Sequence, residues 1–89
     1  MFRLWAKEWK NNHLIKDMTV NDTVPDKTRT HKIFDAITTV CHDFDLPQPI
    51  WLDSNIREFK NSSRTRFTPD SFIEAVPFDY LEIQVIEED

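Results

Sequence analysis

Apolar residues recur at steps of three and four between residues 28 and 44, which is the spacing of an amphipathic helix. Thr28 can cap the start of this helix, and Pro47 disfavours helical geometry in the residue before it. The pattern therefore predicts one long helix over residues 28–44. Its apolar face would consist of Ile33, Phe34, Ile37, Val40, Cys41 and Phe44.

The first part of the chain has the alternation of a β-hairpin. Residues 2–10 and 13–20 each alternate as strands do, and Asn11-Asn12 between them suits a two-residue type I′ turn. We expect the tryptophans of the first strand to face the core. The expected register pairs Lys10 with His13, Trp9 with Leu14 and Trp5 with Met18.

The second half of the chain has shorter patterns. Residues 53–67 are open between helix, strand and loop: Asp53 can cap a helical turn over 54–60, but the same residues suit an irregular edge strand. The other segments are a stiff proline link over 47–49, a short strand over 50–52, a brief strand over 64–67, a short helix from 68 to 76, the clearest strand over 78–86, and an acidic tail over 87–89 that we expect to fray.

This order of elements predicts a single α+β domain over residues 1–89. It resembles the ubiquitin-like β-grasp arrangement, and the resemblance implies a mixed sheet packed on one helix, with the last strand central and parallel to the first. Another α+β sandwich, with one helix on an antiparallel sheet, is the alternative. The modifiers and sulfur carriers of the β-grasp group act through a C-terminal Gly-Gly, whereas this chain ends in Glu-Glu-Asp.

Four runs of the sequence carry a second resemblance. They are TRTHKIF, PIWLDSNIREFK, TRFTPDSFIE and FDYLEIQVIEED. They resemble a group of small uncharacterised proteins of anaerobic Gram-positive bacteria. That resemblance implies no function for any residue.

Composition excludes several function classes. The chain has no glycine, so phosphate-binding loops and nucleophile elbows that require glycine cannot form, and turns with positive φ must use Asn or Asp. A single cysteine excludes an intramolecular disulfide and a cysteine-ligated cluster. The net charge of -5 disfavours general affinity for nucleic acid or anionic membrane.

The long helix carries polar residues that could suggest chemistry. His31 and His42 lie about 16 Å apart along the helix axis, too far to share a metal ion. Cys41 lies at the edge of the apolar face, and His42 diverges from it by about 100°, so we expect a buried, inert thiol. We therefore predict no metal site, no cofactor and no catalytic residues.

A basic segment is the best candidate binding site. It contains Arg57, Lys60, Arg64 and Arg66, with Trp51 nearby. Arginine offers forked donors to phosphate or carboxylate, and an aromatic ring can stack on a base. The competing interpretation is that the aromatic rings belong to the core and the charges lie on a solvated loop.

Two functions follow. The leading hypothesis is a small non-enzymatic protein-interaction or regulatory module of the cytoplasm, whose partner is another protein. The alternative is an anion or nucleic-acid binder that uses Arg57 to Arg66. Convergence of the basic side chains on one exposed face would favour the binder, and dispersal or pairing with acids would favour the interaction module.

Overall fold

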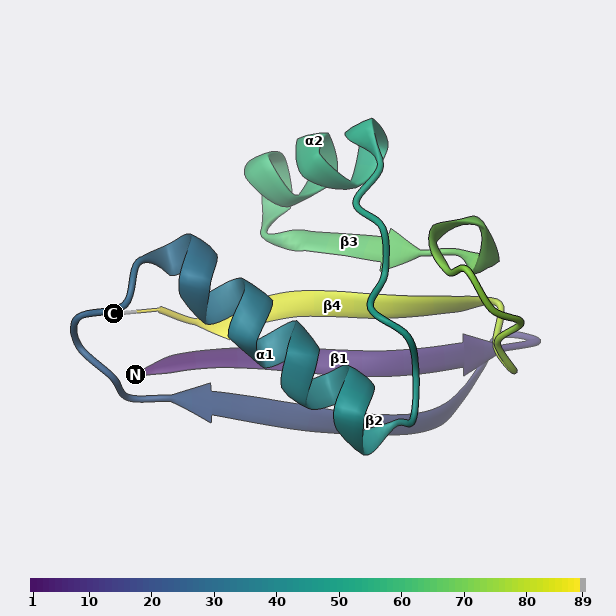
Figure 1. The fold of residues 1–89 in the computed structure, drawn as a ribbon, viewed down its shortest axis with the longest axis horizontal. Helices are drawn as coiled ribbons and strands as arrows, with labels where there is room; N and C mark the ends of the chain where they lie inside the picture. The colour runs from purple at the N-terminus through teal and green to yellow at the C-terminus, as the bar shows by residue number, and fades with distance from the viewer. Residues whose placement is uncertain (89) are drawn as a thin grey trace.

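A computed structural model describes residues 1–88 and shows a four-stranded sheet with two helices on one side (Figure 1). Asp89, at the end of the predicted acidic tail, lies outside the described residues. The elements are β1 (Phe2–Lys10), β2 (His13–Asp22), α1 (Arg29–Asp43), α2 (Asp53–Ser62), β3 (Arg64–Phe67), a 3₁₀ turn (Pro69–Ser71) and β4 (Tyr80–Glu87).

The sheet has the strand order β2-β1-β4-β3 and is antiparallel at every pairing. The prediction that the last strand lies inside the sheet is confirmed. The predicted parallel pairing of β4 with β1, and with it the mixed sheet of the β-grasp arrangement, is wrong. Residues 68–79 reverse the chain after β3, and the Asp79 amide donates to the Trp9 carbonyl at 2.8 Å, so β4 starts beside the end of β1.

Helix α1 forms where the spacing predicted it. The Thr28 side chain accepts a hydrogen bond from the His31 amide, which confirms the predicted cap. The helix packs across β1 and β2 with most of its predicted apolar face buried. Phe34 is the exception, because its side chain is 47% exposed.

The two faces of β1 are the reverse of the prediction. Phe2, Leu4 and Ala6 are buried beneath the helices, whereas Trp5 and Trp9 lie half-buried on the opposite face. Each indole N–H finds an acceptor there: Trp5 donates to Asp17 at 2.8 Å and Trp9 to Glu82 at 3.1 Å. A tryptophan in the apolar layer would need such a partner inside it, so the smaller apolar side chains fill that layer instead.

A bulge explains the error in the hairpin register. The pairs Lys10–His13 and Trp9–Leu14 form as predicted, and the register then shifts between Glu8 and Trp9. Ile15 is passed over, so Thr19 rather than Met18 lies opposite Trp5.

The segment left open in the sequence is a helix followed by a strand. Residues 50–52, predicted as a strand, are irregular, and Leu52 precedes α2 as its cap residue. The Leu52 amide donates to the Asn55 side chain at 3.0 Å, and Asn55 also donates to Thr65 and to the Arg66 carbonyl. Asn55 therefore joins the start of α2 to β3.

The predicted helix over 68–76 is only the 3₁₀ turn Pro69–Ser71. After the turn the chain becomes extended at Phe72, which packs edge-on against Phe78 at 5.5 Å between ring centroids. Both rings are buried, while Ile73 is 79% exposed. The two phenylalanines are thus buried against each other from an irregular segment and not from the predicted helix.

Turns without glycine follow the predicted rule with one addition. Asn11, Asn12 and Asp45 take positive φ, as Asn and Asp tolerate best, and Ser63 does so at the end of α2. At the chain's acidic end, Glu87 belongs to β4 and Glu88 pairs with Arg29. None of the helices within residues 1–88 is long and apolar enough to span a membrane.

The exposure of Phe34 gives a test of the helix packing. Replacing Ile37, which is 1% exposed, with Ala should lower the free energy of unfolding by about 2–5 kcal/mol, because a cavity replaces a core side chain. Phe34→Ala should cost only about 0.5–1.5 kcal/mol, the size of its edge-on contact with Trp51. Urea denaturation of both variants measures the difference. Equal losses would show that Phe34 is a core residue.

Candidate functional site: a groove between two helices

The predicted basic segment is divided among different surfaces. Lys60 and Arg57 lie on α2, and Arg64 and Arg66 lie on β3. Lys60 lines an apolar groove together with Trp51, whereas Arg64 and Arg66 line a polar hollow of about 360 Å³ with Glu58. The structure thus brings Arg64 and Arg66 together, but does not bring all four cations to one site.

Arg64 and Arg66 have partners on β4. The Arg64 Nε lies 4.0 Å from a Glu82 carboxylate oxygen, and the Arg66 guanidinium lies 4.8 Å above the Tyr80 ring. Glu82 also pairs with the buried Lys7 at 3.2 Å. The cations of β3 therefore belong to a network across the face of the sheet that the helices leave open.

Trp51 is the centre of an aromatic cluster. Its ring meets Phe34, Phe59 and Phe67 edge-on, with centroids 5.9, 5.6 and 5.0 Å away. These three partners come from α1, α2 and β3. The sequence suggested that an aromatic ring near the basic segment could stack on a base. The Trp51 ring instead packs against these three rings of the protein.

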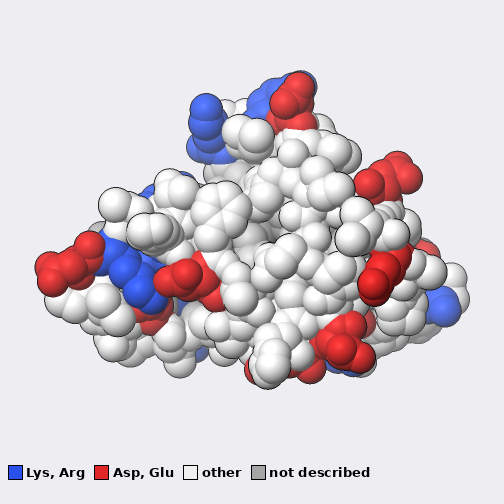
Figure 2. Space-filling model, viewed as in Figure 1, with Lys and Arg blue, Asp and Glu red and all other residues white. Residues whose placement is uncertain are grey.

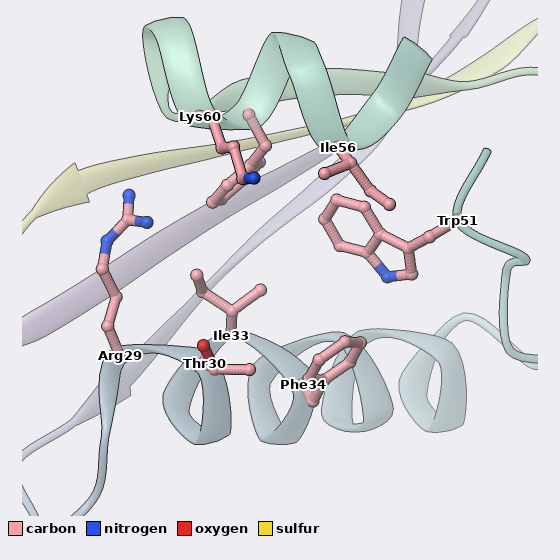
Figure 3. Close-up of a pocket in the computed structure, with 8 residues that line it drawn as sticks. Arg29, Thr30, Ile33, Phe34, Trp51, Ile56 and Lys60 are labelled. Atoms are coloured by element: carbon pink, nitrogen blue, oxygen red, sulfur yellow. The ribbon is translucent and has the colours of Figure 1, made fainter. Parts of the chain in front are cut away.

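The cluster forms one end of a groove between α1 and α2, which we call the α1–α2 groove (Figure 3). Helix α1 covers β1 and β2, whereas α2 packs against β3, so the two helices leave a gap in the layer above the sheet. The groove has a volume of about 290 Å³. It is lined by Arg29, Thr30, Ile33, Phe34, Trp51, Ile56, Phe59 and Lys60.

The apolar lining is partly open to solvent. Phe34 and Ile56 are 47% and 41% exposed, and Figure 3 shows the Trp51 ring between them, with Ile56 on the α2 side and Phe34 on the α1 side. Large apolar side chains that are exposed together around a concave surface are typical of a binding site. Sequence reasoning missed this groove because Phe34 and Ile56 lie on separate helices, whose relative position no local pattern encodes.

The charged end of the groove contains Arg29 and Lys60. Arg29 is held by Glu88 through its Nε, by the Ser63 hydroxyl at 2.9 Å, and above the Phe59 ring at 5.4 Å. Lys60 has no hydrogen-bond or ion-pair partner among residues 1–88. Both charged groups of the lining are therefore cations, and one of them already binds a carboxylate.

Glu8 is a second feature that the sequence did not indicate. Its side chain is 1% exposed beneath the helical layer, and neither carboxyl oxygen has a hydrogen-bond partner in the described part of the chain. Burial raises the pKa of Glu8, and Lys16, opposite it on β2, lowers that pKa by a smaller amount. The prediction that the tryptophans of β1 face the core puts Glu8 on the opposite face, and the reversal of the two faces is what buries it.

The polar residues of α1 form no chemical site. Cys41 is 2% exposed, and burial raises the pKa of its thiol to about 11, so the predicted buried cysteine is confirmed and the thiol stays protonated at neutral pH. His31 and His42 are exposed. Within residues 1–88 no cluster of three or more His, Cys, Asp or Glu side chains could hold a metal ion.

Comparisons of the chain with protein-family models, with curated proteins and with solved structures found no match. The resemblance to small proteins of anaerobic Gram-positive bacteria stays a prediction.

The burial of Glu8 predicts a pH-dependent cost. A carboxyl whose pKa is raised by folding favours the folded state only below its ordinary pKa near 4.5, and that contribution is lost as the pH rises through the raised value. At pH 7 folding must therefore either desolvate the Glu8 charge or protonate it, and either costs free energy. Glu8→Gln removes this charge, so it should raise the free energy of unfolding at pH 7 by about 1–3 kcal/mol.

Urea denaturation at pH 4 and pH 7 tests this expectation. The gain from Glu8→Gln should disappear at pH 4, where the wild-type carboxyl is protonated. Glu74→Gln is the matched control, because Glu74 is exposed. A destabilising Glu8→Gln at pH 7 would show that the carboxylate is paired in solution.

Proposed function

We propose that this protein is a small non-enzymatic protein-interaction module, acting as an accessory or regulatory partner of a larger protein. The observation that carries the proposal is the exposed apolar lining of the α1–α2 groove around Phe34, Trp51 and Ile56. Leu52, at the start of α2, is a further large apolar residue that is 41% exposed.

The surface around the groove supports the same proposal. Figure 2 shows this face of the molecule with a broad uncharged centre and with charged side chains gathered toward its outline. An interface of this kind, with an apolar centre and a polar rim, is common where proteins associate. On this face, the charged side chains therefore lie mostly around the uncharged centre (Figure 2).

The lining gives no support to an enzymatic role. Among the eight lining residues, Thr30 has the one hydroxyl group, and there is no acid or histidine to act as a general base for it. We expect a cytoplasmic location, since a chain with one cysteine gains nothing from an oxidising compartment.

The anion or nucleic-acid binder is the weaker proposal. Arg64 and Arg66 share a polar hollow with Glu58 and are engaged by Glu82 and Tyr80. An anionic ligand would have to compete with these contacts on a chain of net charge -5.

Affinity capture with matched variants tests the two proposals. The tagged wild-type protein is compared with Phe34→Glu/Ile56→Glu and with Arg64→Gln/Arg66→Gln in lysate of the source cells, and bound proteins and nucleic acids are quantified. A charge buried at each of two apolar contacts should reduce capture of a direct protein partner at least about tenfold. The arginine variant should retain the partner.

The controls decide between folding and binding. Thermal melts must show that both double variants are still folded at the temperature of the capture experiment. Loss of the Phe34–Trp51 contact should lower the Tm of Phe34→Glu/Ile56→Glu by about 4–8 °C for each kcal/mol lost. Loss of a bound partner or nucleic acid only in Arg64→Gln/Arg66→Gln would overturn the groove proposal and favour the anion binder.

A further inference from the structure

The charge of the α1–α2 groove is opposite to that of the chain. The protein has 16 acidic and 11 basic residues, yet the charged residues lining the groove are Arg29 and Lys60. An acidic protein with a locally cationic groove attracts a negative group to that point more strongly than to the surrounding surface. This complementarity indicates what kind of ligand fits.

The two kinds of lining are separated along the groove. Figure 3 shows Arg29 and Lys60 toward one end and Phe34, Trp51 and Ile56 toward the other. A ligand that satisfies both ends therefore needs a bulky apolar group and a negative group a short distance apart. The volume of about 290 Å³ lies near the lower limit of about 300 Å³ for ligand pockets, so it suits one or two side chains of a larger molecule.

The chain itself shows that a carboxylate can bind at the cationic end. Glu88, which follows β4, binds the Arg29 Nε, and Arg29 also contacts the Phe59 ring in the groove. Lys60 lacks any such partner among the described residues. One cation is thus occupied by an internal carboxylate, and the other is free to accept an external one.

We propose that the α1–α2 groove binds a peptide segment of the partner protein that carries a bulky apolar side chain close to an acidic one. The apolar side chain packs on the exposed surface that Phe34, Trp51 and Ile56 form together, and the carboxylate contacts Lys60. Glu88 competes with that carboxylate for Arg29 and so weakens binding. This inference rests on the proposed function, because it names the chemistry of the segment recognised by the interaction module.

Two short peptides test the recognition directly. Acetylated and amidated Phe-Ala-Glu and Phe-Ala-Gln are titrated into ¹⁵N-labelled protein, and the NMR shifts of the Trp51 indole and the Lys60 amide are followed. The Glu peptide should bind about two- to fivefold more tightly, the range expected of a solvent-exposed ion pair. An Ala-Ala-Glu peptide should bind much more weakly than either, because it lacks the apolar anchor.

Variants assign the preference to the two cations. Lys60→Met should reduce the difference between the Glu and Gln peptides, because only Arg29, which Glu88 already engages, remains to bind the carboxylate. Lys10→Met, at an exposed position in the hairpin turn region, should leave the difference unchanged. Glu88→Gln should raise the affinity for the Glu peptide about two- to fivefold and leave the Gln peptide unaffected.

Each outcome decides one part of the proposal. Equal affinities of the wild type for the Glu and Gln peptides would overturn acidic recognition, while the apolar groove of the proposed function would stand. Absence of shifts with both peptides at millimolar concentration would overturn the whole inference, and the capture experiment would still judge the interaction module separately. No gain in Glu88→Gln would overturn the competition by Glu88.

Discussion

Packing of α1 on the inner face of β1 is the interaction from which the other features follow. Phe2, Leu4 and Ala6 are 1% exposed or less beneath the helical layer, and their burial decides which way β1 faces. Trp5 and Trp9 then lie on the open face, where Asp17 and Glu82 accept their indole N–H groups. Burial of apolar surface stabilises the fold by about 25 cal/mol per Å². It favours this orientation of β1 only if the two indole N–H groups keep their hydrogen bonds on the open face.

The same choice of face also creates the polar network on the open face and buries the Glu8 carboxyl on the other. Lys7 lies between the two tryptophans on the same face of β1. From there its Nζ reaches Glu82 and packs over the Trp5 ring, 3.8 Å from the ring centroid. Glu8 continues the buried face of Phe2, Leu4 and Ala6, so it lies in the core, where its carboxyl has no hydrogen-bond partner in the described part of the chain. The energetic cost of Glu8 is thus a consequence of strand periodicity, because reversing β1 would bury two indoles instead.

Local features of the fold could be predicted from the sequence, and non-local ones could not. The Thr28 cap, the three- and four-residue spacing of α1 and the Asn11-Asn12 turn depend on neighbours in the chain, and all three are confirmed. The direction of β4 depends on how residues 68–79 reverse the chain, a segment in which Phe72 packs against Phe78. Alternation within a strand is the same for parallel and antiparallel pairing, so it could not reveal this.

In the candidate site, too, the sequence indicated some residues, while others depend on contacts between distant parts of the chain. Lys60 and Trp51 were identified from composition, and both line the groove. Phe34 was placed in the core because it continues the apolar stripe of α1, yet it lies at the edge of that stripe and faces α2 across the groove. Arg29 was overlooked, since its role depends on Ser63 and Glu88, which are 34 and 59 residues away in the chain.

The architecture of the groove also limits the kind of association it can support. Edge-on contacts of Trp51 with rings from α1, α2 and β3 hold its apolar end in place, so little ordering is needed on binding. A preformed cavity of about 290 Å³ can bury only a small part of a partner. Stable interfaces bury about 800 Å² on each partner, so in the proposed complex the groove would supply an anchor, and a durable complex would need further contacts across the uncharged centre of the face in Figure 2. A short peptide alone should therefore bind weakly, and the strength of a full complex should depend on how much of that face the partner covers.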